Sequence, residues 1–137
     1  MGSPSLASKL KLKPGQKAVV INPPEGYLKT LASAVAEARL SDPLDDRYDW
    51  IQVFVRNKAE LEAWVPRVLP ALRQASLLWI SFPKGSSRIQ TDLTRDTGWD
   101  SLQQADLKWI NLVSVDDIWS AFCLRPYRPG EAHQSFR

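Results

Sequence analysis

The chain has 137 residues, of which 44% are hydrophobic and 24% charged, as expected for one folded globular domain and not for a disordered or fibrous segment. Its formal net charge is +3, but the excess lysine and arginine lies largely near the two ends, so we do not expect specific nucleic-acid binding. No apolar run reaches the roughly 20 residues of a membrane helix, and the first residues lack the order of a signal peptide, so no membrane contact is expected.

Cysteine and histidine each occur once, which limits the chemistry available to this chain. Cys123 cannot form an internal disulfide or a multi-thiolate metal site, and a reducing cytoplasm is its natural setting. It alternates with Ala121 and Trp119 in an apolar run, which predicts a small core residue. His133 lies in a polar terminal segment, so a Ser-His-Asp or Cys-His site would have no ordered base, and no metal site is expected.

Three apolar runs predict buried strands. The first, at 18–21, ends before a proline pair that cannot continue a strand ladder. The second, at 50–55, is apolar apart from Gln52, and the third, at 77–81, stops close to Pro83. Continuous apolar character is typical of parallel strands that are covered on both faces. A further strand around residues 35–40 is only weakly indicated.

Helical patterns separate these runs. An Ala- and Leu-rich segment from Glu25 predicts a helix. Asn57, with Glu60 three residues later, predicts a capping box at the start of another helix, which we expect to kink or split near Val65 because prolines follow at 66 and 70. A short helix is expected after Thr91 and through about Gln104, weakened by Gly98.

The last apolar runs, at 109–115 and 118–124, flank two aspartates and predict a β-hairpin. Residues 127–137 are polar and interrupted by proline, so we expect a flexible tail, with a flexible N-terminus over residues 1–9 and a single domain over 10–126. The alternation of strand and helix predicts an open, mostly parallel α/β sheet with helices on both faces and a C-terminal antiparallel hairpin.

Two resemblances accompany this pattern. The order of "LKPGQKAVVINPPEGYL", "YDWIQVFV" and "LPALRQASLLWISFPKGSS" resembles a shortened class I methyltransferase fold. More closely, "LKPGQKAVVINPPEGY", "FPKGSSRIQTDLTRDTGW" and "DDIWSAFCLRP" resemble an uncharacterised bacterial family known only as a domain of unknown function, over about residues 10–126. The likeness implies a Rossmann-like fold and no particular activity.

The methyltransferase likeness implies S-adenosylmethionine as a cofactor, which that family binds with a glycine-rich turn and an acidic residue after the second strand. Here the turn "NPPEGY" keeps Gly26 alone, while Pro23 and Pro24 remove two backbone donors. The aspartates between residues 42 and 46 lie in a segment of loop composition. We therefore expect no cofactor, with S-adenosylmethionine as the alternative.

Ligands of open α/β sheets bind outside the carboxyl ends of the strands, where the loop after the third predicted strand begins. Its lysine, hydroxyls and amides suit an anion, although a single glycine falls short of a phosphate-binding loop. The turn after the first strand is expected to face the same edge. The candidate ligand-binding residues are Lys84, Ser86, Ser87, Arg88, Asn22 and Glu25.

A second group of polar residues, with three- and four-residue spacing, would share one face of the helix predicted after Thr91. It can be read as a carboxylate pair and an arginine beside an aromatic platform, or as a structural network in which one aspartate caps the helix. The structural reading is preferred, which makes the loop chiefly a rigid rim. The residues are Asp92, Arg95, Asp96 and Trp99.

These observations favour a non-enzymatic binding or interaction module whose partner is a protein or a small anionic ligand. The alternative is a transferase that uses S-adenosylmethionine or a related nucleotide through an atypical cofactor loop.

Overall fold

The computed structural model describes residues 9–13, 16–27, 29, 38–40, 47–85, 91, 93 and 98–132. Its strands are β1 (Ala18–Ile21), β2 (Ala38–Leu40), β3 (Tyr48–Phe54), β4 (Leu72–Pro83), β5 (Leu107–Ser114) and β6 (Trp119–Pro126). Its helical elements are α3 (Lys58–Val68), the 3₁₀ helix η1 (Leu69–Ala71) and α4 (Asp100–Gln103).

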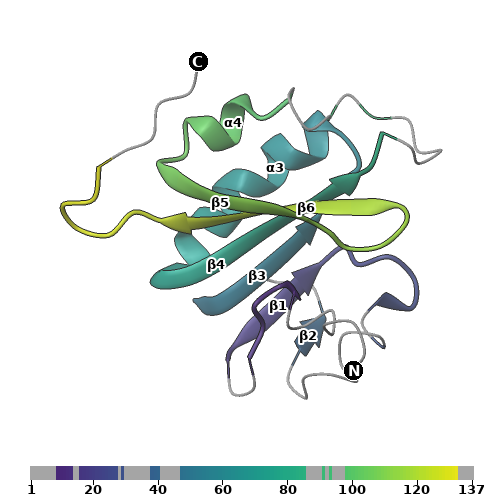
Figure 1. Cartoon of the computed structure of the whole chain (residues 1–137), viewed down its shortest axis with the longest axis horizontal. Helices are drawn as coiled ribbons and strands as arrows, with labels where there is room; N and C mark the ends of the chain where they lie inside the picture. The colour runs from purple at the N-terminus through teal and green to yellow at the C-terminus, as the bar shows by residue number, and fades with distance from the viewer. Residues whose placement is uncertain are drawn as a thin grey trace.

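The strands form one open, mixed sheet of six strands in the order β2-β1-β3-β4-β6-β5 (Figure 1). β1, β3 and β4 are adjacent and parallel, and β2 is parallel to β1 on its other side. β6 pairs antiparallel with both β4 and β5, so the terminal hairpin belongs to the same sheet. The predicted parallel strands and terminal hairpin are confirmed, and the weakly indicated strand within 35–40 is the short β2.

The start of α3 is a variant of the predicted capping box, in which Asn57 is the cap as expected but Glu60 reaches the amide of the preceding residue, Arg56. The Asn57 side chain accepts a hydrogen bond from the Glu60 amide at 2.9 Å, and Glu60 Oε1 accepts from the Arg56 amide at 2.6 Å. Of the predicted kink or split near Val65, the split is wrong, because α3 continues through Pro66 to Val68, and the kink stays a prediction. Burial of the apolar face of α3 in the core outweighs the one backbone donor that Pro66 removes.

The helix predicted from Thr91 begins later in the structure. Thr91 and Leu93 are not helical, and the Leu93 amide donates instead to the Thr91 hydroxyl at 3.0 Å. Gly98 has a φ of 98°, which interrupts any helix reaching it, so α4 begins only at Asp100. The intervening positions 92 and 94–97 lie outside the described residues.

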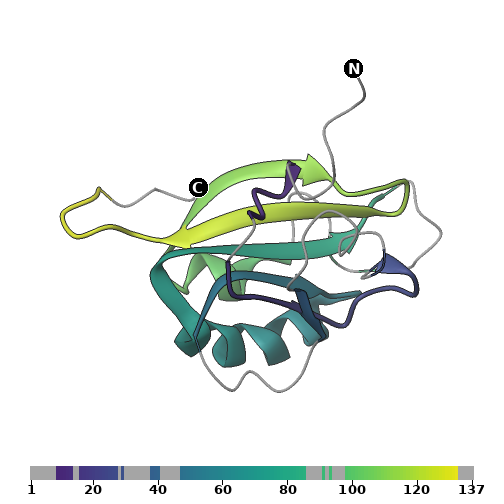
Figure 2. The same ribbon diagram turned by 90° about the horizontal axis from the view of Figure 1, so that it is seen from below.

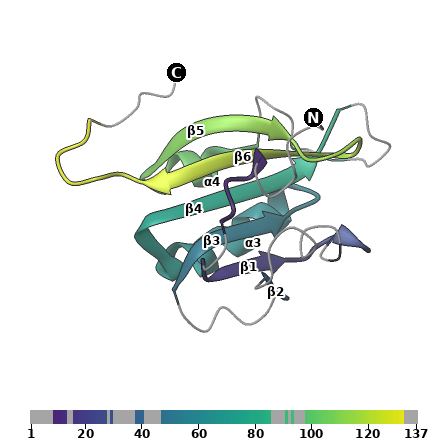
Figure 3. The same ribbon diagram turned by 60° about the horizontal axis from the view of Figure 1, so that its bottom comes forward.

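Two apolar clusters cover the two faces of the sheet. The helix-side core packs α3, η1 and α4 against the sheet, and Figure 2 shows α3 along that face. The opposite cluster contains Leu10, Leu12 and Tyr27 with Trp50, Trp79 and other side chains of the sheet. We call residues Lys9–Lys13 the N-terminal strap, and Figure 3 shows it crossing the sheet on the side away from the helices. The helix predicted from Glu25 falls mostly outside the described residues, so helices on both faces remain a prediction.

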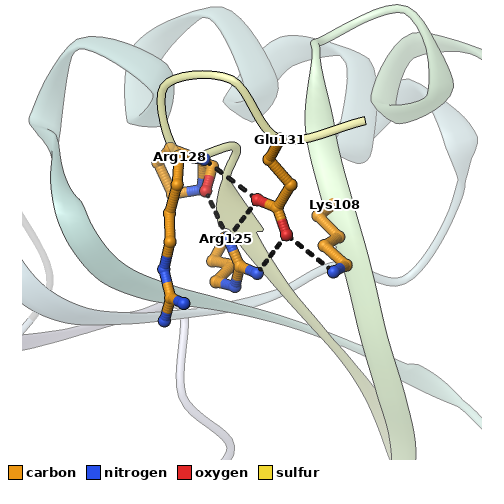
Figure 4. A network of polar contacts seen from close by, with 5 residues as sticks. Lys108, Arg125, Arg128 and Glu131 are labelled. Atoms are coloured by element: carbon orange, nitrogen blue, oxygen red, sulfur yellow. Dashed lines mark hydrogen bonds and ion pairs between the residues drawn. The ribbon is translucent and has the colours of Figure 1, made fainter. Parts of the chain in front are cut away.

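The chain after β6 has an anchor that its composition did not suggest, at least as far as Ala132. The Glu131 carboxylate accepts hydrogen bonds from both Nη atoms of Arg125 at 2.9 and 2.8 Å, from the Arg128 amide at 3.0 Å and from Lys108 Nζ at 2.7 Å (Figure 4). The bonds from Arg125, then those from Arg128 and Lys108, hold the pKa of Glu131 far below its ordinary value. The carboxylate therefore stays charged and ties this segment to β5 and β6.

Candidate functional site

The strand order contains one reversal. From β1 the chain passes to β2 on one side, then returns to β3 on the other side of β1 and continues to β4. Such a topological switch point leaves a crevice at the carboxyl ends of the strands, where open α/β sheets bind their ligands. A cavity of about 310 Å³ lies there, and we call it the switch-point crevice. It is lined by Asn22, Pro23, Pro24, Phe54, Arg56, Glu60 and Trp119.

The turn after β1 forms one wall of the crevice. Asn22 has a φ of 55°, a left-handed conformation that asparagine tolerates better than most residues and that turns the chain at the end of the strand. The two prolines that follow fix the backbone, and the Pro24 carbonyl accepts a hydrogen bond from the Tyr27 amide at 3.0 Å. Gly26, with a φ of 81°, completes the turn.

Aromatic side chains form the apolar part of the lining. Phe54 at the end of β3 and Trp119 at the start of β6 meet edge to face, with ring centroids 5.1 Å apart. Tyr27 contacts Phe54 in the same manner at 4.7 Å. Edge-to-face contacts stabilise such clusters beyond the area they bury, so this wall is held in place before any ligand arrives.

Two opposite charges complete the crevice. Arg56 follows the end of β3 and is exposed, whereas Glu60 in the first turn of α3 is half-buried. One Glu60 oxygen already accepts the Arg56 backbone amide. Among the residues that the structure describes, the two side chains form no ion pair with each other, and the Arg56 guanidinium has no hydrogen-bond partner.

A buried chain of hydrogen bonds lies next to the aromatic wall. The Tyr27 hydroxyl donates to Gln52 Oε1 at 2.5 Å, and Gln52 Nε2 donates to Ser81 Oγ at 2.9 Å. Gln52 and Ser81 are fully buried. Burial raises the pKa of Tyr27 well above its ordinary value, an effect that the bond to Gln52 partly offsets. The phenol is therefore a neutral donor and not a base.

The predicted loop site is described only in part. The Lys84 amide donates to the Ile118 carbonyl at 2.7 Å and its Nζ to Ser114 Oγ at 2.6 Å, so this lysine fastens β4 to the hairpin turn and is not in the crevice lining. Asn22 does line the crevice, whereas Glu25 is exposed and is not among the lining residues. Ser86, Ser87 and Arg88 lie outside the described residues.

The predicted polar network is likewise described at one position only. Trp99 is buried and meets Phe82 and Phe122 edge to face, with ring centroids 4.9 and 5.1 Å away. The other three members lie outside the described residues, so the network stays a prediction. They are Asp92, Arg95 and Asp96.

Cys123 is fully buried on β6, as predicted for a core residue. Burial raises the pKa of its thiol to about 11, and the charge of Lys11 lowers it only partly. At neutral pH the group is therefore a thiol, which is a poor nucleophile. In the part of the chain that the structure describes, no three His, Cys, Asp or Glu side chains gather as a metal site would require, and no helix is long and apolar enough to cross a membrane.

Sequence reasoning missed most of the crevice. Arg56 stands directly after the second predicted strand, which is the position from which a side chain can reach a ligand. That signal was available, but it points to a site only once β2 is known to lie on the other side of β1, which makes the gap between β1 and β3 the reversal of strand order. The missed lining residues are Phe54, Arg56, Glu60 and Trp119.

No protein-family model and no curated protein matches this sequence. Solved structures do match. The mitomycin 7-O-methyltransferase MmcR superposes with a TM-score of 0.60 at 10% identity, over 80% of this chain and 48% of that one. The Bacillus subtilis tRNA methyltransferase TrmK gives 0.60 at 12% identity, over 93% and 67% of the two chains. An S-adenosylmethionine-dependent methyltransferase from Clostridium acetobutylicum gives 0.56 at 5% identity, over 80% and 82%.

The chain thus spans about half of the length of MmcR and two thirds of that of TrmK. At these identities the likeness concerns the fold alone, and the resemblance to an uncharacterised bacterial family stays a prediction. The protein has the Rossmann-like fold of class I S-adenosylmethionine-dependent methyltransferases.

Proposed function

We propose that this chain is a binding module that holds a small organic molecule in the switch-point crevice. The observation that carries the proposal is the position of the cavity, between the carboxyl ends of β1 and β3 at the reversal of strand order. Its volume of about 310 Å³ is at the small end of the range for ligand pockets. Its lining combines the rings of two prolines and two aromatic residues with the polar side chains of Asn22, Arg56 and Glu60.

The chemistry next to the crevice is that of recognition. The phenol of Tyr27 stays protonated and donates its proton to Gln52. Glu60 accepts the Arg56 amide and so has a structural role at the start of α3. Rigid aromatic and proline walls favour binding, because little conformational entropy is lost when a ligand enters.

Nuclear magnetic resonance with ¹⁵N-labelled protein tests this proposal. The probes are amino acids, aromatic carboxylates, adenine nucleotides, S-adenosylmethionine and its demethylated product. We expect at least one compound to shift the amide signals of Phe54, Arg56, Glu60 and Trp119. A second cavity at the opposite edge of the sheet, lined in part by Gln74 and Asp106, is the internal control. Shifts confined to that cavity, or none at all, would contradict the proposal.

The second candidate is a transferase that uses S-adenosylmethionine, and the fold likeness favours it. The turn after β1 argues against it, because Pro23 and Pro24 line the crevice without an amide proton to offer. We predict that S-adenosylmethionine binds with a dissociation constant weaker than about 100 μM, near −5.5 kcal/mol. Titration calorimetry measures this directly, and tighter binding would restore the transferase as the first candidate.

A further inference from the structure

The charges in the switch-point crevice are unusual because they are opposite and yet do not pair. Arg56 and Glu60 line the same cavity of about 310 Å³, and the structure, in the residues it describes, places no ion pair between them. Ion pairs do form elsewhere on the same molecule: Lys58 meets Asp100 at 3.5 Å, and Arg73 meets Asp49 at 2.9 Å. One cationic and one anionic side chain in the crevice are therefore available to bind a ligand.

A ligand that carries a single charge would satisfy only one of these groups. A carboxylate that enters the crevice would pair with the guanidinium of Arg56 but would be repelled by the Glu60 carboxylate. An ammonium group would pair with Glu60 but would be repelled by Arg56. A ligand that displaces water from a charged side chain without offering an opposite charge in its place loses binding free energy. A ligand with one group of each sign satisfies both side chains together.

The rest of the lining defines the body of that ligand. Phe54 and Trp119 present aromatic rings, and Pro23 and Pro24 present an apolar ring surface. These four rings suit a ligand with a planar or apolar body, and a cavity of about 310 Å³ limits that body to roughly the size of one aromatic amino acid.

We infer that the crevice binds a free α-amino acid with an apolar, preferably aromatic, side chain. Its carboxylate pairs with Arg56, and its ammonium group pairs with the Glu60 oxygen that the Arg56 amide leaves open. This inference rests on the proposed function, because it names the ligand class of the same crevice.

Three probes of one shape separate the contributions of the two charges. L-Phenylalanine carries both, 3-phenylpropionate only the carboxylate, and phenethylamine only the ammonium group. Each is titrated while the amide signals of Arg56, Glu60 and Trp119 are followed. We expect L-phenylalanine to bind with a dissociation constant on the order of 1 mM or tighter. The other two should each bind about tenfold more weakly.

Matched variants assign each charge to its side chain. Arg56→Gln should weaken L-phenylalanine and 3-phenylpropionate about tenfold, and it should not weaken phenethylamine, whose ammonium group is freed from the repulsion of the guanidinium. Glu60→Gln removes the charge but keeps an amide oxygen for the start of α3, and it should weaken L-phenylalanine and phenethylamine only. Arg67→Gln is the control, since Arg67 lies on α3 over the ring of Trp64, 4.0 Å from its centroid, and does not line the crevice.

The outcomes distinguish this inference from the proposed function. Equal binding of the three probes at the crevice, or binding that neither charge-removing variant changes, overturns the zwitterion while leaving a ligand-binding crevice in place. The same holds if other compounds shift the crevice amides and L-phenylalanine does not. If no compound shifts those amides, the proposed function fails as well.

Discussion

Tyr27, Gln52 and Ser81 form a polar chain within an otherwise apolar face of the sheet. The amide of Gln52 bridges the two hydroxyls, so each member has a partner despite full burial at Gln52 and Ser81. Buried polar groups are tolerated only when they are paired in this way. Because Tyr27 also contacts Phe54, these hydrogen bonds help to fix the aromatic wall of the crevice.

We predict that Tyr27→Phe lowers the free energy of unfolding by about 1 to 3 kcal/mol, because it leaves the buried Gln52 oxygen without its donor. Chemical denaturation at pH 7 measures the loss. The double variant Tyr27→Phe with Gln52→Leu is the control, and it should cost less than the sum of the two single changes, because it removes both partners of the Tyr27–Gln52 bond. Additive effects would show that the two side chains do not depend on each other.

The same residue predicts a dependence on pH. An unfolded tyrosine ionises near pH 10, whereas burial raises the pKa of Tyr27 in the folded protein. The folded state therefore keeps the phenol proton to a higher pH than the unfolded state does. The stability that this group contributes is complete below about pH 10 and falls as the pH rises above it. The free energy of unfolding of the parent and of Tyr27→Phe is measured by denaturation at pH 8 and at pH 10.5. The difference between the two proteins should be smaller at pH 10.5 than at pH 8. A constant gap between them would contradict the raised pKa.

At the scale of elements, the start of α3 links stability to the site. Asn57 caps the helix, and Arg56 and Glu60, which line the crevice, lie on either side of it. We predict that Asn57→Ala lowers the free energy of unfolding by about 1 kcal/mol and also weakens crevice binding. Asn57→Asp, which keeps a capping oxygen, should do neither. Chemical denaturation and the amide titration measure the two effects, and equal behaviour of the two variants would contradict the role of the cap.

The same elements show what local sequence can and cannot predict. The cap at Asn57 and the strand at 50–55 depend on neighbours within a few residues, so their patterns were sufficient. The end of α3 was misjudged because the core holds its last turn despite Pro66. The start of α4 depends on the backbone of Gly98, whose positive φ no hydrophobic pattern reveals.

At the scale of the whole molecule, the candidate site depends on strand order, which no local pattern contains. β2 is only three residues long, yet its place beside β1 creates the reversal that opens the crevice. Sequence reasoning drew its candidate residues from the loop after β4 and from the turn after β1, and of these only Asn22 lines the crevice among the residues that the structure describes. Once the reversal is known, the space between β1 and β3 is distinguished from the rest of that edge.

The N-terminal strap is a second feature that only the assembled molecule explains. Leu10 and Leu12 are 0% and 4% exposed, and the Leu10 carbonyl accepts a hydrogen bond from Trp50 Nε1 at 2.8 Å. The strap therefore covers the central strands on the face of the sheet opposite α3. It shields the apolar side chains of that face from water, as α3 shields those of the opposite face.

We predict that Leu10→Ala lowers the free energy of unfolding by about 2 to 5 kcal/mol, since it removes a fully buried leucine from the cluster around Trp50 and Trp79. Lys9→Ala, at an exposed position of the same strap, should change it by less than about 0.5 kcal/mol. Lys11 has a φ of 57°, so Lys11→Gly should stabilise the protein by relieving backbone strain. Chemical denaturation of the three variants tests the strap as a unit. If Leu10→Ala unfolds like the parent, the strap lies on the sheet without holding it, and the sheet face must be stable without this cover.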